Sequence, residues 1–309
     1  MQTYHQARVG AADIDDLGHM NVRVYARHAA AGVHGLLAAL EFAEPAQHAL
    51  GARIEQPDCH TLFRREQLEG APIAVRGGVI GAGPAELQLY LELFNVERDE
   101  LSATVHKVVR LVDRQNRKPL EFPPAVLAGA EQLQIAWPDH GKPRSLPARH
   151  VRRDLTPGDM QAKGIPVRFD GYEVTPAMAT PEGYMDLAGA PWLAFADGPI
   201  KREEREAVEG AEEQSWFGDG SISVATLEAR HTLVDVPRVG EKVVSYTGIT
   251  DIGRKIMRFC HWSFAKDSGR LLAVLDEVGI GLNLQTRRSC EFPPAMREEL
   301  QAQSHPELF

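Results

Sequence analysis

The hydrophobic residues of this chain follow two different periodicities. Over residues 22–40, apolar side chains return every three or four positions, which predicts a helix with one buried face. Small residues such as Ala29 and Gly32 keep that helix slim, so a sheet could wrap closely around it. Over residues 53–112 the period shortens to the two residues typical of strands, most clearly among the alternating leucines at 87–93.

Four strand-like runs follow the predicted helix, and an extended segment at residues 4–9 precedes it. Short turns with glycines or charged residues separate the runs, and such turns favour an antiparallel sheet, because parallel strands need longer crossovers. The runs cover residues 53–65, 73–81, 86–97 and 101–112. We therefore predict an α+β unit in which one buried helix packs against one antiparallel sheet.

The chain also repeats itself. Residues 121–125 and 291–295 share the sequence Glu-Phe-Pro-Pro-Ala, and their offset of 170 holds without a gap through about sixty preceding residues. Identical residues at this offset include Gly70 and Gly240, Gly78 and Gly248, Gly83 and Gly253, Phe94 and Phe264, and Arg117 and Arg287. A gapless match of this length indicates a duplicated unit.

The repeat divides the chain into four segments. We predict an N-terminal domain at residues 1–128, a proline-rich linker at 129–166, a C-terminal domain at 167–295 and a polar tail at 296–309. The C-terminal domain opens with an extended segment at 167–174, and a second helix is expected after it.

Composition narrows the class of protein. The 309 residues carry 34 Lys and Arg against 43 Asp and Glu, a net charge of −9, which argues against nucleic acid or an anionic membrane as main partner. Three widely spaced cysteines form no disulfide framework or Cys-x-x-Cys motif. The first twenty residues do not have the pattern of a signal peptide, and no apolar run is long enough for a membrane span. We therefore expect a cytoplasmic protein.

A short acidic motif lies immediately before the first helix. It reads Asp-x-Asp-x-x-Gly-His-Met-Asn from residue 13 to residue 21, and Tyr25 follows four residues later. A carboxylate beside a helix N-terminus can act as nucleophile or general base, and the unpaired amides there can hold an oxyanion. An aspartate before a helix is also a common N-cap, and glycine a common turn residue, so the motif alone does not decide between catalysis and structure.

The whole string, from Asp13 to Tyr25, resembles the signature of hotdog-fold acyl-CoA thioesterases of the 4-hydroxybenzoyl-CoA thioesterase-like group. Both repeats resemble hotdog domains, in which a sheet wraps around a long central helix. The resemblance therefore implies a tandem, or double, hotdog. In this family the site usually lies between two domains, so the second repeat is expected to supply walls of a site that contains Asp15.

The resemblance assigns roles to individual residues. It makes Asp15 the catalytic carboxylate, with His19 and Asn21 orienting the attacking water, the thioester carbonyl or Asp15 itself. The substrate-binding residues that we infer from it are Gly18, Met20, Tyr25, Arg64 and Arg117. Tyr25 is equally well explained as a packing aromatic, and basic residues such as the two arginines are more often solvated surface charges than ligands.

The second repeat departs from the motif. With Gly183 aligned to Gly18, Thr180 takes the place of Asp15 and Tyr184 the place of His19. We expect this copy to have kept the fold and lost its acid.

The sequence thus predicts a hydrolase that cleaves an acyl-CoA thioester to a carboxylic acid and free CoA. No metal site or separate cofactor is expected, because the twelve histidines show no ligand spacing and CoA belongs to the substrate. The chain could also assemble into a homo-oligomer. Two alternatives stay open: a hotdog hydratase or dehydratase acting on an acyl thioester, and a non-catalytic acyl-CoA binding protein.

Overall fold

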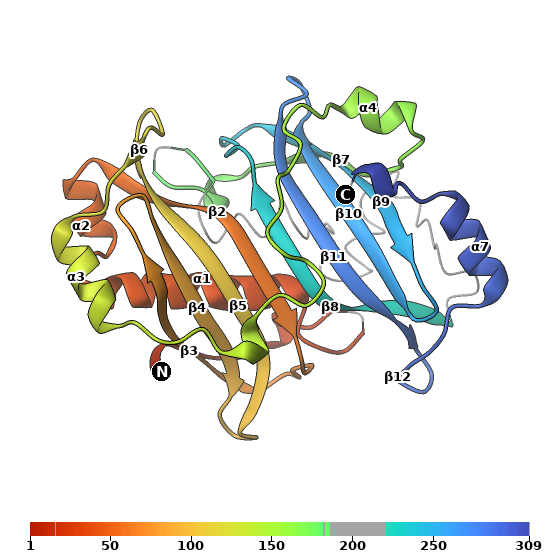
Figure 1. Cartoon of the computed structure of the whole chain (residues 1–309), viewed down its shortest axis with the longest axis horizontal. Coiled ribbons are helices and arrows are strands. Elements are labelled where there is room, and N and C mark those ends of the chain that lie inside the picture. Colours follow the sequence, from red (N-terminus) through yellow and green to blue (C-terminus); the bar gives the residue numbers. More distant parts are fainter. Residues whose placement is uncertain (16, 182, 186–220, 309) are drawn as a thin grey trace.

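The strands of the two repeats join in one continuous antiparallel sheet (Figure 1). The computed structural model describes residues 1–15, 17–181, 183–185 and 221–308. In this part of the chain the strand order is β1-β3-β4-β5-β2-β8-β11-β10-β9-β7, with β6 paired to β5 and β12 to β11. The strands are β1 (Gln2–Arg8), β2 (Ala52–Phe63), β3 (Pro72–Ala82), β4 (Glu86–Asn95), β5 (Glu100–Asp113), β6 (Pro119–Leu120), β7 (Val167–Glu173), β8 (Ile222–Leu233), β9 (Lys242–Ile252), β10 (Ile256–Ala265), β11 (Leu271–Asn283) and β12 (Arg288–Ser289).

Helices lie at the faces and ends of this sheet. They are α1 (Val22–Ala39), α2 (Glu44–Ala49), α3 (Pro124–Gln132), α4 (Pro157–Ala162) and α7 (Pro294–Ala302), with short 3-10 turns η1 (Ala11–Asp13), η2 (Asp139–Gly141), η3 (Pro176–Met178) and η4 (Pro306–Leu308). The expected first helix and the six expected extended segments that fall in described residues are confirmed, to within a few residues at each end. The expected helix of the second repeat falls in residues 186–220, outside the described residues.

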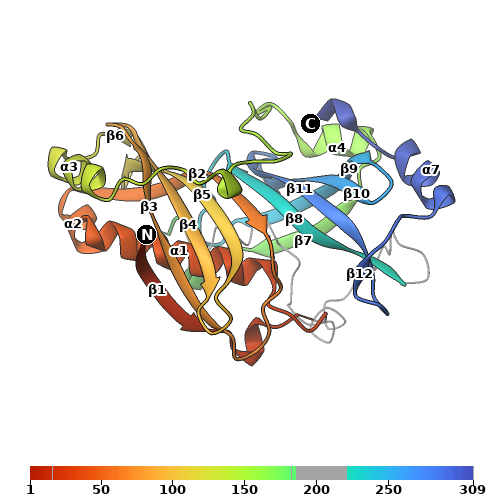
Figure 2. The ribbon, with the colours of Figure 1, turned by 60° about the horizontal axis from the view of Figure 1, so that its bottom comes forward.

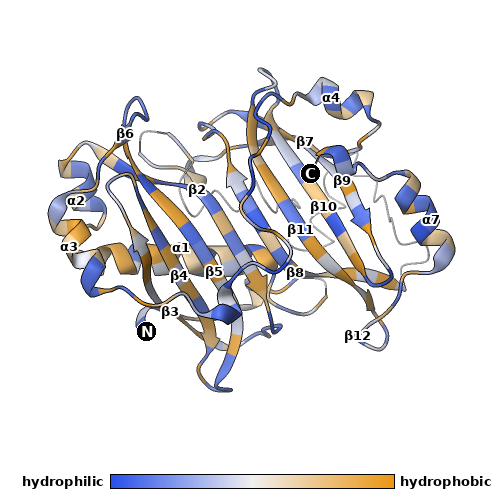
Figure 3. Cartoon of the chain, viewed as in Figure 1, coloured by the Kyte–Doolittle hydropathy of each residue, from blue (hydrophilic) through white to orange (hydrophobic). Residues whose placement is uncertain are grey.

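Helix α1 packs against the sheet of the first repeat at very short range. A methyl group added to Gly32 would overlap Val75 of β3, and one added to Gly35 would overlap the backbone carbonyl of Tyr4 in β1. The alternating leucines of β4 bury one face against α1, including Leu91, which borders Gly32. Figure 3 shows the matching alternation of apolar and polar positions along β4 and β5. The slim helix expected from the sequence is therefore what lets helix and sheet form one core.

The two repeats meet edge to edge, through β2 and β8. His60 of β2 lies opposite Arg230 of β8, and these two residues are equivalent under the 170-residue offset. The residue pairs on either side of His60 and Arg230 are related to each other by the same 170-residue offset. An approximate two-fold axis therefore passes between His60 and Arg230. The strand order on the two sides of the seam mirrors this symmetry.

The linker, expected only to connect the domains, packs across the face of the sheet opposite α1 (Figure 2). Glu228, which is 2% exposed, accepts hydrogen bonds from the backbone amides of residues 144–146 and pairs with His60 at 2.7 Å. Further along, Arg149 makes a two-bonded ion pair with Asp276 of β11. The linker therefore closes the outer side of the seam.

In its described residues, the predicted polar tail at residues 296–309 is largely exposed, but it packs against the second repeat through a few apolar side chains. Helix α7 contacts β9, and Leu300 and Leu308 are both buried. Leu308 belongs to an apolar cluster with Trp262 of β10 and Met160 of α4. These few apolar residues anchor a segment whose average composition is polar, and a compositional argument overlooks them.

Candidate active site

The acidic motif folds into a tight turn that ends at the start of α1. The Asp15 amide donates to the His19 carbonyl at 2.9 Å, and the Gly18 amide donates to the Asp15 carbonyl at 2.9 Å. Gly18 adopts φ +81°, a left-handed conformation that favours glycine. A side chain at Gly18 would meet no atom of the described residues within 4 Å.

This turn brings Asp15 and His19 together. Oδ2 of Asp15 lies 3.3 Å from Nδ1 of His19, while Oδ1 accepts a hydrogen bond from the Leu17 amide at 3.0 Å. Both side chains are mostly buried, at 14% and 16% exposure. A carboxylate held in this way keeps access to solvent and has a fixed orientation, as a general base or nucleophile requires.

A second carboxylate lies on the other side of the imidazole. Oε1 of Glu66 is 3.6 Å from Nε2 of His19, and Oε2 accepts a bond from Arg287 of the second repeat at 3.0 Å. The hydrogen bond to Asp15 raises the pKa of His19; burial opposes this rise, and the negative charges of Asp15 and Glu66 add to it. His19 is therefore biased towards its protonated form.

Asn21 begins α1. Its side-chain oxygen accepts a hydrogen bond from the Arg23 amide at 3.0 Å, so Asn21 is an N-cap and has only its amide NH2 to offer a substrate. Its carbonyl takes the Val24 amide at 2.9 Å. Within the described part of the chain the Val22 amide has no partner, which leaves one backbone donor at the positive end of the helix.

The structure places Met20 and Tyr25 in the core of the first repeat rather than on an open surface. Met20 is 1% exposed and Tyr25 is 4% exposed. The Tyr25 hydroxyl donates to the Arg65 carbonyl at 3.0 Å and its ring packs edge to face on Phe63. Burial raises the pKa of Tyr25 to about 12. These contacts match the packing alternative for Tyr25, and Met20 likewise packs against the core.

Neither arginine expected to bind substrate lies beside the motif. Arg64 projects to the face opposite α1 and donates to the His140 carbonyl of the linker. Arg117 pairs with Glu55 and Asp235. Sequence spacing could not show this, because Arg64 and Arg117 lie in loops beyond the ends of β2 and β5, and their partners come from distant parts of the chain.

The second repeat builds the same turn without the acid. The Thr180 amide donates to the Tyr184 carbonyl at 2.8 Å, the Gly183 amide donates to the Thr180 carbonyl at 2.8 Å, and Gly183 has φ +78°. These bonds reproduce those of Asp15, His19 and Gly18, so the alignment of the two motifs is geometrically correct. The main-chain scaffold is retained while a hydroxyl replaces the carboxylate.

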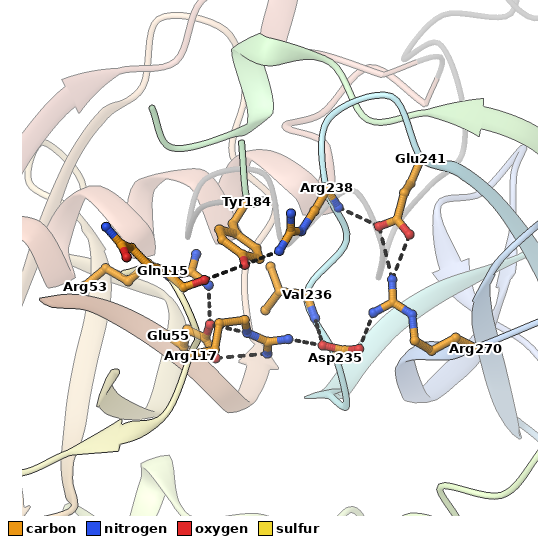
Figure 4. Close-up of polar contacts among 10 residues, drawn as sticks. All are labelled: Arg53, Glu55, Gln115, Arg117, Tyr184, Asp235, Val236, Arg238, Glu241 and Arg270. Carbon is orange, nitrogen blue, oxygen red and sulfur yellow. Dashed lines mark hydrogen bonds and ion pairs between the residues drawn. The ribbon is translucent and has the colours of Figure 1, made fainter. Parts of the chain in front are cut away.

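Ion pairs surround this second turn (Figure 4). Arg117 makes two bonds to Glu55 and contacts Asp235 across the seam, and Arg270 joins Asp235 to Glu241. A hollow of about 470 Å³ lies beside them.

Tyr184 lies at the centre of this arrangement. Its hydroxyl donates to the Gln115 carbonyl at 3.1 Å and accepts from Arg238. The guanidinium groups of Arg53 and Arg238 lie 4.1 and 4.5 Å from its ring centre. Most of the polar side chains around the second turn therefore already form hydrogen bonds or ion pairs with one another.

The described residues contain neither a cluster of metal-ligand type nor a membrane-spanning helix. Among them, no three His, Cys, Asp or Glu side chains are grouped so as to hold a metal ion. No helix in the described ranges has the length and apolar character needed to cross a membrane.

Comparison with known proteins identifies the family. The model of the thioesterase-like superfamily matches residues 9–129 and again residues 184–300, one match in each repeat. The chain belongs to this superfamily. Membership confirms the predicted tandem hotdog thioesterase and a thioester hydrolase activity, while the roles of individual residues stay predictions.

Solved structures of thioesterases share the fold. A protein described as an oleoyl thioesterase from Lactobacillus plantarum aligns over 90% of this chain and 96% of its own, with TM-score 0.66 and 10% identity. The 12:0-ACP thioesterase from Umbellularia californica aligns over 90% and 93%, with TM-score 0.65 and 8% identity. An acyl-ACP thioesterase from Bacteroides thetaiotaomicron aligns over 90% and 97%, with TM-score 0.61 and 8% identity. No curated protein matches the sequence. Identities this low establish the shared fold only.

Two residues near the Asp15–His19 pair were not predicted from the sequence. Glu66 follows β2 and lies 3.6 Å from His19, and Arg287, in the turn between β11 and β12, pairs with Glu66 at 3.0 Å. The matching positions of Arg117 and Arg287 in the repeats were the available signal for Arg287. The sequence contains no motif that marks Glu66.

Proposed function

We propose that this protein hydrolyses acyl-CoA thioesters, with Asp15 as the catalytic carboxylate. The observation that carries the proposal is the Asp15–His19 pair, mostly buried and held by a tight turn at the start of α1. Membership of the thioesterase-like superfamily supports the reaction type.

In the general-base route, Asp15 removes a proton from water as its oxygen attacks the thioester carbon. In this proposal the Val22 amide, together with the dipole of α1, stabilises the oxyanion; one such donor contributes roughly 3 kcal/mol in acyl transfer. When the C–S bond breaks, the thiolate leaves and takes a proton, which protonated His19 or the newly protonated Asp15 supplies. In the nucleophilic route, Asp15 attacks the carbon itself and water then hydrolyses the mixed anhydride.

Replacing Asp15 by asparagine tests the proposal. Asp15→Asn keeps an oxygen for the Leu17 amide but removes the charge, so we expect thiol release to fall about 10²- to 10⁴-fold with little change in thermal unfolding. Thr180→Asn is the matched control, because it places the same side chain in the equivalent turn of the second repeat and should leave turnover intact. Unchanged turnover in Asp15→Asn would refute the assignment.

The same assay distinguishes the alternatives. Because three structures of similar fold include acyl-ACP thioesterases, acyl-ACP should be tested beside a panel of acyl-CoA chain lengths. If the protein hydrolyses acyl-ACP and not acyl-CoA, the proposed thioester hydrolysis stands, but the acyl carrier is ACP instead of CoA. Hydration of an enoyl-CoA without thiol release would favour the hydratase. Tight binding without turnover would favour a binding protein, an option that the loss of the acid at Thr180 keeps open.

A further inference from the structure

We propose that Glu66, held by Arg287 of the second repeat, is a positioning residue that fixes His19 against Asp15. The inference rests on the proposed function and assigns the second repeat a part in the reaction. Nothing in the acidic motif itself supplies this contact, because Glu66 lies beyond β2 and Arg287 in the other repeat.

The two ring nitrogens of His19 face two carboxylates. Nδ1 lies 3.3 Å from Asp15 and Nε2 lies 3.6 Å from Glu66. The longer separation exceeds a normal hydrogen bond, so Glu66 attracts the imidazolium without taking up its Nε2 proton. The attraction to Glu66 favours the ring orientation in which Nδ1 faces Asp15, and it leaves the Nε2–H available to the substrate.

Arg287 restrains Glu66 from the far side of the seam. It has φ +55° in the turn before β12, and its equivalent Arg117 has φ +60° in the turn before β6. Non-glycine residues adopt such a conformation only where the surrounding turn imposes it. In both turns a side chain of the preceding strand, Asp113 or Asn283, accepts the backbone amides that close the turn. The backbone position of each arginine is therefore set by its turn, and its guanidinium group is held by the carboxylates that it contacts.

Arg117 and Arg287 differ in the carboxylates with which they pair. Arg117 reaches Glu55 through two bonds and also Asp235, and it forms part of a network that ties the repeats together. Among the described residues, Glu66 is the carboxylate that pairs with Arg287. One cross-seam arginine thus completes a structural network, while its counterpart completes the surroundings of the catalytic pair.

Four proteins test this inference: Glu66→Gln, Arg287→Gln, the double variant and Arg117→Gln as matched control. The charged groups that face His19 in the described chain are Asp15, Glu66 and Arg287. Removing the Glu66 charge should lower the pKa of His19, followed by NMR of its ring protons, which are assigned by comparison with His19→Gln. A purely structural role for Glu66 would not change this pKa.

The second measurement is the steady-state kinetics of each variant with the acyl thioester that the wild type hydrolyses fastest. We expect Glu66→Gln and Arg287→Gln each to lower kcat about two- to fivefold with KM nearly unchanged, as befits a partly exposed ion pair. The double variant should be no slower than the slower single variant, because Arg287 acts through Glu66. Arg117→Gln should lower the melting temperature and leave kcat unchanged.

Each contrary outcome overturns the inference. An unchanged pKa of His19 in Glu66→Gln removes its basis, whatever the activity. Multiplicative losses in the double variant separate Arg287 from Glu66, and a rise in KM alone in Arg287→Gln makes that residue a ligand contact. An equal loss of kcat in Arg117→Gln means general loosening of the seam. If the wild type releases no thiol from any acyl thioester, the proposed function fails while the NMR titration still decides the role of Glu66.

Discussion

His19 couples the chemistry of the site to its stability. Its pKa is raised in the folded protein, first by the hydrogen bond to Asp15, so the folded state binds this proton more tightly than the unfolded chain. The resulting stabilisation is fully present below the unfolded value of about 6.5 and is lost as the pH rises through the higher folded value.

We therefore predict that His19→Gln costs more stability in acid than in base. The difference in unfolding free energy between wild type and variant should be larger near about pH 5.5 than near about pH 9 by roughly 0.5–1 kcal/mol, a typical ion-pair contribution. Urea unfolding at both pH values measures it. Equal differences at the two pH values would show that His19 is not held as a cation.

Single residues also show why the motif is ambiguous when read alone. Asn21 is the N-cap of α1, and Met20 packs in the core, so the same string encodes both structure and chemistry. Side-chain burial separates these roles, and a linear sequence does not report it. Asp15 differs because its second oxygen faces His19 and is not bonded to the backbone.

At the scale of elements, the close approach of α1 to the sheet determines where the motif lies. Glycine is normally a poor helix residue, by about 1 kcal/mol relative to alanine, so its presence in α1 needs another reason. Gly35 lies against the Tyr4 carbonyl of β1, and this contact keeps the helix close to the sheet.

This contact predicts opposite results for two Gly→Ala changes. Gly35→Ala should destabilise the protein by about 1–3 kcal/mol, because the new methyl meets backbone that cannot move freely. Gly129→Ala in α3 should be nearly neutral or stabilising, since its methyl would lie 3.2 Å from the flexible end of Leu40. Thermal and urea unfolding of both variants would check this, and equal effects would contradict a backbone clash.

At the scale of the whole molecule, duplication has produced two equivalent turns with different contents. The turn of the first repeat holds Asp15 and His19, while that of the second holds Thr180 and Tyr184 among ion pairs that cross the seam. Two hotdog domains thus retain one acidic turn, and the second turn stabilises the interface instead.

We accordingly predict one substrate site per chain. Calorimetric titration of the Asp15→Asn variant with acyl-CoA should give a stoichiometry of one, because the polar groups near Tyr184 already bind each other. A stoichiometry of two would show that the second turn also binds acyl-CoA. Dynamic light scattering on the same sample would report assembly of chains, on which the count per chain does not depend.

The sequence by itself determined the elements, the duplication and the acidic motif, because hydrophobic periodicity, turn residues and short motifs are local properties of the chain. It also indicated that the second repeat had lost its acid at Thr180. What only the tertiary structure decided is which side chains meet: Arg64 and Arg117 away from the motif, and Glu66 and Arg287 beside it. Those contacts depend on strand register and on the seam between β2 and β8, which join residues far apart in sequence.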